Sequence, residues 1–149
     1  GLGQAMILFL DACALIYRFE DADPFRVAAR DLIAQLTAGQ PVVDVVVSRL
    51  SVLECRVKPL RDGDVALLKK YDAFFAAIQI VELSAEVVDV ATHLRVRHGL
   101  KTPDALQALS TLSLQGAALF VTADAGFARV SALEVRLIRA ISGSFTAPG

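Results

Sequence analysis

The chain has 149 residues, of which 55% are hydrophobic and 21% are charged, and its formal net charge at pH 7 is −1. This length and composition fit one domain with a buried core, and they exclude a disordered protein. The nearly neutral charge gives no overall attraction to nucleic acid. Any contact with phosphate would therefore need a local basic patch or a bound metal ion.

The first residues give expectations about where the protein begins and where it resides. The apolar run Met6–Leu10 ends at Asp11, which does not fit a signal peptide. We interpret Gly1 to Ala5 as a remnant of an expression tag, so that a single domain would span residues 6–149. No apolar run reaches the roughly 18 residues that cross a bilayer, and two cysteines favour free thiols in a reducing compartment. We therefore expect a cytoplasmic protein without a membrane segment.

Five short β-rich runs alternate along the chain with stretches of helical spacing. The runs are Met6–Leu10, Val42–Val47, Gln79–Leu83, Ala118–Thr122 and Val135–Ile138. Most are continuously apolar, which is typical of strands that are covered on both faces. Strands that alternate with helices favour a parallel sheet with right-handed crossovers. The sequence predicts an α/β fold, but these signals do not fix the order of the strands.

Three of the helices have recognisable start signals. Asp23 is expected to cap a helix that Pro24 opens and that runs to about residue 37. Ser84 is expected to cap a second helix, which runs to Gly99. A third helix is expected to start at Thr102 by the same combination of a capping side chain and a following proline.

Four acidic residues fall at positions that face one edge of the predicted sheet. Asp11 and Asp124 follow the first and fourth strands, whereas Glu54 and Asp104 lie in the first turns of helices. Ligands of open parallel sheets bind beyond the carboxyl ends of the strands. Crowded, partly buried carboxylates are costly unless a cation joins them, and oxygen ligands select hard ions such as Mg²⁺ or Mn²⁺. Taken singly, Asp104 could be a plain first-turn acid, and Asp124 could cap a short helix over residues 125–130.

Four blocks of the sequence resemble the signature blocks of PIN-domain proteins. They are Leu10–Leu15, Ser48–Glu54, Lys101–Leu106 and Val121–Phe127, and the likeness is strongest to the VapC-type toxins of toxin–antitoxin pairs. The resemblance covers the chain from Met6 onward. It implies a three-layer α/β/α sandwich around a parallel sheet of four to five strands. It also implies an Mg²⁺- or Mn²⁺-dependent endoribonuclease that forms a homodimer and is silenced by a cognate antitoxin protein.

The resemblance implies roles for the acidic residues. Asp11, Glu54, Asp104 and Asp124 would form the catalytic quartet, with Asp11, Asp104 and Asp124 as metal ligands. Glu54 would bind the metal through water or accept a proton.

The sequence departs from the family pattern near three of these acids. Ala12 and Cys13 stand where hydroxyl or amide residues are common, Gln107 replaces a frequent His, and Ala123 replaces Asn or Arg. None of these changes removes a carboxylate. Losing polar groups at positions 12 and 13 could weaken the orientation of the attacking water.

Basic residues near the acidic blocks are candidates for contacts with RNA. We interpret Arg49, Arg56 and Lys101 as substrate-binding residues because they flank the predicted acidic pocket. A run of charges is, however, more often a solvated face. Thr122 is a further candidate for the substrate site, or for orienting a carboxylate or a water molecule.

Two other functions stay open. An aspartate-based phosphotransferase of the haloacid-dehalogenase or receiver kind also places an Asp after its first strand. It would need a second Asp two residues later, where Cys13 stands, or an acidic pair nearby. It would also need a Lys after a later strand, and none follows the Ala118–Thr122 run. The other alternative is a catalytically silent PIN-like module that binds RNA or protein.

Overall fold

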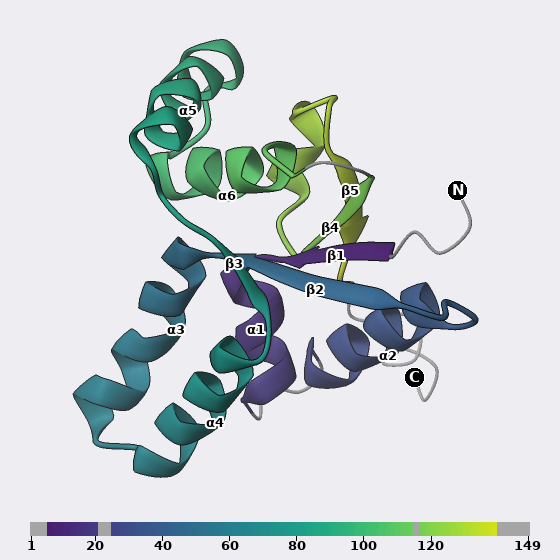
Figure 1. Cartoon of the computed structure of the whole chain (residues 1–149), viewed down its shortest axis with the longest axis vertical. Coiled ribbons are helices and arrows are strands. Elements are labelled where there is room, and N and C mark those ends of the chain that lie inside the picture. The colour runs from purple at the N-terminus through teal and green to yellow at the C-terminus, as the bar shows by residue number, and fades with distance from the viewer. Residues whose placement is uncertain (1–5, 21–24, 115–116, 140–149) are drawn as a thin grey trace, which may run out of the picture.

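The computed structural model describes residues 6–20, 25–114 and 117–139, which form five strands, six α-helices and one 3₁₀ helix (Figure 1). The expected tag residues Gly1 to Ala5 and the expected cap at Asp23 and Pro24 lie outside the described residues. In chain order the elements are β1 (Met6–Leu10), α1 (Ala12–Phe19), α2 (Phe25–Thr37), β2 (Val43–Ser48), α3 (Arg49–Asp62), α4 (Val65–Ala76), β3 (Gln79–Val81), α5 (Ala85–His98), α6 (Thr102–Leu112), β4 (Ala118–Thr122), η1 (Ala125–Arg129) and β5 (Glu134–Leu137).

The five strands form one parallel sheet in the order β3-β2-β1-β4-β5. The central strand is β1, where Phe9 is in register with Val46 of β2 on one side and with Phe120 of β4 on the other. All five predicted strands are present, with ends that differ by no more than two residues from the predicted ones. This order places the ends of β1 and β4 next to each other.

Helices cover both faces of the sheet, which gives the three-layer α/β/α sandwich that was expected. Figure 1 shows α1 to α4 on one side of the sheet and α5 and α6 on the other. Alternate side chains of each central strand enter the two layers. Leu8 and Leu10 pack toward the α1–α4 side, and Phe9 packs between the sheet and the α5–α6 side. Because both faces are buried, the central strand β1 is apolar at all of its positions rather than at every second one.

The helix ends follow from local capping, with one correction. Ser84 Oγ accepts a hydrogen bond of 3.2 Å from the Val87 amide, and α5 ends at Gly99, whose φ of 65° favours glycine. The expected cap at Thr102 is wrong. The extended cap residue is Lys101, and Thr102 is already the first residue of α6. Proline is tolerated throughout the first helical turn, because the amides there have no partner within the helix, so Pro103 did not fix the start to one residue.

Two helices that the sequence did not delimit, α1 and α4, start with aspartate caps. The Ala14 amide donates to Asp11 Oδ1 over 3.0 Å, and the Leu67 amide donates to Asp64 Oδ1 over 3.0 Å. Over the ranges that the structure describes, no helix combines the length and apolar character needed to cross a membrane.

Candidate active site

The four acidic residues predicted from the sequence line one cavity of about 150 Å³. Asp11 follows β1, Asp124 follows β4, Glu54 lies on α3 and Asp104 lies in the first turn of α6. Because β1 and β4 are neighbours, the first two acids meet at the carboxyl edge of the sheet. The remaining wall of the cavity comes from Ala12, Cys13, Pro103, Gln107 and Phe127.

Asp11 is the most deeply buried of the four acids, with 5% of its surface exposed. Its Oδ1 accepts hydrogen bonds from the Ala14 amide (3.0 Å) and from Cys13 Sγ (2.8 Å), and its Oδ2 accepts one from Thr122 Oγ1. Burial raises the pKa of Asp11 above its usual range, while these three hydrogen bonds act in the opposite direction. Both carboxylate oxygens are thus held in place by the protein.

Thr122 connects two of the acids. Its hydroxyl donates to Asp11 Oδ2 and accepts a hydrogen bond of 3.0 Å from the Asp124 amide. The residue is fully buried, and its hydroxyl is occupied by these contacts. This geometry fits the orienting role considered from the sequence and leaves no surface for the direct substrate contact that was also considered.

Cys13 supplies a hydrogen bond that was not expected from the sequence. Its thiol donates to Asp11 Oδ1, and its sulfur accepts a hydrogen bond of 3.3 Å from the Ala123 amide. Burial and the charge of Asp11 raise the pKa of the Cys13 thiol to about 12, so it stays protonated and remains a donor. The expected loss of a polar group is therefore wrong at position 13 and applies only to Ala12.

Glu54 and Asp104 are half-buried and occupy the walls formed by α3 and α6. Burial, followed by the charges of Asp11 and Asp104, raises the pKa of Glu54, and a hydrogen bond with Gln107 acts in the opposite direction. Burial and the charge of Asp124 raise the pKa of Asp104. Because the ionised forms are disfavoured by desolvation and by each other, a cation placed among them would be attracted strongly.

A buried hydrogen bond ties the two acid-bearing helices together. Gln107, with 3% of its surface exposed, donates from Nε2 to Ser51 Oγ over 2.9 Å. Gln107 lies three residues after Asp104 on α6, and Ser51 lies three residues before Glu54 on α3, so each pair shares a helix face. Within the described part of the chain, Gln107 Oε1 has no hydrogen-bond partner. In the sequence, Gln107 stands out only as a replacement for His.

The donor set fits a hard divalent cation. All four acids present carboxylate oxygens, which Mg²⁺ and Mn²⁺ prefer, and three of them have a raised pKa. In residues 6–20, 25–114 and 117–139, no group of three or more His, Cys, Asp or Glu side chains meets the geometric requirements for holding a metal ion. The carboxylates share a cavity, but they are not drawn together into a closed coordination shell.

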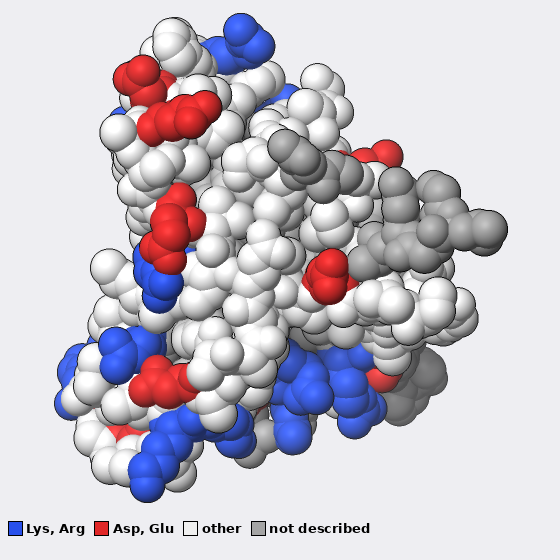
Figure 2. Space-filling model, viewed as in Figure 1, with Lys and Arg blue, Asp and Glu red and all other residues white. Residues whose placement is uncertain are grey.

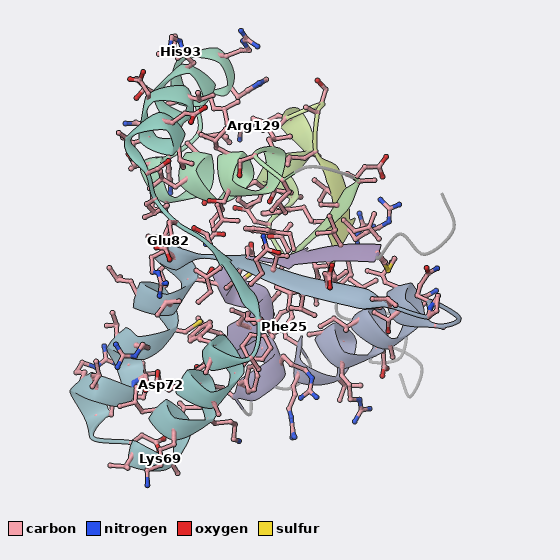
Figure 3. The ribbon with its side chains drawn as sticks, viewed as in Figure 1. Phe25, Lys69, Asp72, Glu82, His93 and Arg129 are labelled. Carbon is pink, nitrogen blue, oxygen red and sulfur yellow. The ribbon has the colours of Figure 1, made fainter. Side chains whose placement is uncertain are left out.

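Two of the basic residues predicted to bind substrate are engaged elsewhere. Arg49 Nε donates to both carboxylate oxygens of Glu82 (3.1 and 3.0 Å), and Arg56 Nε donates to Asp72 Oδ1 over 2.9 Å. Neither arginine lines the acidic cavity. Their partners come from residues 72 and 82, far along the chain, so the local sequence could not reveal these pairs. Figure 3 shows Glu82 beside the start of α3 and Asp72 on α4.

The third predicted contact, Lys101, lies beside the acids, together with an arginine, Arg129, that was not predicted from the sequence. Lys101 and Arg129 line a cavity of about 170 Å³ that also contains Asp104 and Asp124. Arg129 ends η1, five residues after Asp124, and its Nη1 donates to the His98 carbonyl over 3.2 Å. The only signal in the sequence was its place just past the fourth block.

Comparisons with known proteins agree with this fold. A family model described as the PIN domain matches residues 8–133. VapBC2 from Rickettsia felis, solved bound to a DNA fragment from the promoter, aligns with a TM-score of 0.69, 16% identity, and coverage of 90% of this chain and 100% of that chain. A toxin–antitoxin complex from Klebsiella pneumoniae aligns with a TM-score of 0.68, 18% identity, and coverage of 90% and 99%.

A third solved structure is VapC20 of Mycobacterium tuberculosis, described as a toxin that cleaves the sarcin–ricin loop. It aligns with a TM-score of 0.67 and 18% identity over 87% of this chain and 98% of that chain. No curated protein matches the sequence. At these identities the structural matches establish the fold alone.

Proposed function

The chain belongs to the PIN-domain family, and from that premise we propose that it is a metal-dependent endoribonuclease of the VapC toxin type. The observation that carries the proposal is the cavity in which Asp11, Glu54, Asp104 and Asp124 meet. Further support comes from the fold shared with a toxin described as cleaving the sarcin–ricin loop. The reaction would be hydrolysis of an RNA phosphodiester bond.

Asp11, Asp104 and Asp124 are the residues that would hold Mg²⁺ or Mn²⁺ in this proposal. A bound ion of this kind activates a water molecule and stabilises the charge that develops on the phosphodiester. The chain's own contribution is to fix the ligands in advance. Asp11 is oriented by Thr122 and Cys13, and Asp124 Oδ1 accepts a hydrogen bond of 2.8 Å from the Gly126 amide. Ligands that are already oriented need little rearrangement when substrate arrives.

Glu54 has a different position and a different proposed role. Asp11 and Asp124 each have a carboxylate oxygen bound to a backbone amide, whereas Glu54 contacts the side-chain amide of Gln107. We assign to Glu54 the role of accepting the proton of the attacking water. The bond from Gln107 to Ser51 holds α6 against α3 and thereby sets the distance between Glu54 and Asp104.

The toxin assignment includes a cognate antitoxin protein, a homodimer and action in the cytoplasm. Support for a protein partner comes from the solved structure described as a toxin–antitoxin complex and from an apolar stripe on α3. Leu53, Val57 and Leu60 recur at helical spacing, and 60%, 51% and 57% of their respective surfaces are exposed. Exposed apolar side chains that are aligned in this way fit a partner helix better than they fit solvent.

The test is cleavage of single-stranded RNA by the purified protein. We expect cleavage in the presence of Mg²⁺ or Mn²⁺, loss of cleavage with a chelator, and loss in Asp11→Asn. Cleavage that persists in Asp11→Asn, or that a chelator does not affect, would contradict the mechanism. Binding of RNA without cleavage would favour a silent module. A phosphorylated protein after incubation with a phosphate donor would favour the phosphotransferase.

A further inference from the structure

A second cavity adjoins the carboxylate cavity and differs from it in charge. The two cavities share Asp104, Asp124 and Phe127, and the second one adds Lys101 and Arg129 together with Gly99, Leu100 and Gly126. Its volume is about 170 Å³. A strand of RNA crossing the acidic site would therefore pass two cations as it leaves.

Lys101 and Arg129 differ from the basic residues of α3 in their partners. Arg49, Arg56, Lys58 and Arg61 are each ion-paired with a carboxylate within 4 Å. Of the ion pairs that join described residues, none includes Lys101 or Arg129. Both cations are near enough to Asp104 to lower its pKa, against the effect of burial. Their charges are thus directed at the site without being neutralised by a direct pair.

The backbone around Arg129 holds the guanidinium and leaves space beside it. Arg129 Nη1 is anchored to the His98 carbonyl, at the end of α5. A Cβ added at Gly99 would lie 3.9 Å from Nη1, and one added at Gly126 would lie 3.7 Å from Nη2. Two glycines therefore border the guanidinium, and no hydrogen bond within the described part of the chain occupies its other N–H groups. Figure 3 shows Arg129 on the α5–α6 side of the sheet, away from Asp72 on α4.

We propose that Lys101 and Arg129 form a subsite for a backbone phosphate of RNA next to the carboxylate cavity, an inference that rests on the proposed ribonuclease function. A guanidinium presents paired donors that match phosphate oxygens, and an ammonium adds a compact positive charge. Lys101 is also the cap residue of α6, where the helix dipole favours an anion.

This arrangement explains how a chain with a net charge of −1 can bind RNA. Figure 2 shows that, on the face in view, basic side chains gather over the lower helices, with acidic ones among them. Much of that positive charge is paired, as it is for Arg49 and Arg56. In the proposed subsite, two unpaired cations act on one phosphate beside the reacting one. Binding then depends on a local contact rather than on the overall field.

The experiment measures the salt dependence of RNA binding by fluorescence anisotropy. The parent protein is Asp11→Asn with Mg²⁺, so that a labelled single-stranded RNA stays intact, and affinity is measured between about 50 and 200 mM salt. The slope of log K against log salt is negative, and each lost phosphate contact decreases its magnitude by about 0.7 for a single strand. We expect this decrease for Arg129→Ala and for Lys101→Ala, and retention of the slope in Arg129→Lys. Arg61→Ala, which removes an ion-paired charge, is the matched control and keeps the parent slope.

The outcomes separate the subsite from the proposed function. If the slopes of Arg129→Ala and Lys101→Ala equal the parent slope while the wild type cleaves RNA, the subsite is wrong and the ribonuclease stands. A decrease in Arg49→Ala or Arg56→Ala in place of these two variants would also overturn the subsite. If the parent does not bind RNA and the wild type does not cleave it, the proposed function itself fails. Melting curves of each variant establish that the folded protein is being compared.

Discussion

Replacing Thr122 by Val removes one hydroxyl from the centre of the site and keeps the shape of the side chain. The change deletes the hydrogen bond to Asp11 Oδ2 and the acceptor of the Asp124 amide. Because Asp11 is 5% exposed, water cannot readily replace the lost donor. A hydrogen bond to a charged group contributes about 1.5–3 kcal/mol, so we expect a loss of about 2 kcal/mol in the free energy of unfolding at neutral pH. For a domain of this size, that corresponds to a decrease in Tm of about 4–8 °C.

The pH dependence of this loss identifies its cause. The hydrogen bond from Thr122 lowers the pKa of Asp11, so its removal raises a pKa that burial has already raised. A raised pKa in the folded state costs stability above the unfolded value of 3.8, and the cost disappears below it because Asp11 is then protonated in both states. The difference in Tm between Thr122→Val and wild type should therefore shrink as the pH falls from 7.5 toward about 4.

Thermal unfolding followed by circular dichroism at several pH values measures the effect. Thr122→Ser, which keeps the hydroxyl, is the control and should retain most of the stability at neutral pH. A Thr122→Val protein as stable as Thr122→Ser at neutral pH would refute the reasoning. So would a loss that is equal at acidic and neutral pH, because a pure packing defect does not depend on the charge of Asp11.

Four further predictions follow from the same geometry. Without metal, the wild-type Tm should fall as the pH rises above the unfolded pKa values of 3.8–4.5, because Asp11, Glu54 and Asp104 all have raised pKa values in the folded protein. Added Mn²⁺ should reverse this fall, and a Tm that rises with pH over this range would contradict the prediction. Gln107→Leu should lower kcat more than it raises KM and cost about 1–3 kcal/mol of stability. In a double-mutant cycle, the stability losses of Gln107→Leu and Ser51→Ala should not add, because both remove the same hydrogen bond. Full additivity would show that this bond has no role. Native Cys13 should resist alkylation by iodoacetamide at pH 8, because its thiol has a pKa of about 12, and rapid labelling would refute this. Asp104→Asn should reduce cleavage at least about 100-fold, because it removes a proposed metal ligand. It should not lower the metal-free Tm, because the removed carboxylate has a raised pKa and therefore costs stability when ionised. A decrease in Tm would indicate a structural role for Asp104.

The positions of the acids could be predicted because each one lies at or near a strand end or a helix start that the sequence marks. Asp11 ends an apolar strand, and Asp104 follows a proline at a helix start. A parallel sheet brings such positions to one edge whatever the strand order is. For the same reason the strands themselves were found to within two residues.

The residues around the acids could not be predicted, because their roles depend on which elements are neighbours. Thr122 can orient Asp11 only because β4 lies next to β1, and strand order was not available from the sequence. Nearness along the chain suggested Arg49 as an RNA contact, but its side chain pairs with Glu82, 33 residues away. Arg129 was missed because its contact with the end of α5 spans 31 residues. Long-range pairing decided each of these cases.

The proposed function depends on the binding of a divalent cation in the shared carboxylate cavity. The most direct measurement is titration of the purified protein with Mn²⁺, followed by electron paramagnetic resonance of the free ion, in wild type and in Asp11→Asn. We expect saturable binding at the wild-type cavity that is strongly weakened in Asp11→Asn, while both proteins stay folded by circular dichroism. Equal binding by the two proteins, or no saturable binding by wild type, would contradict it.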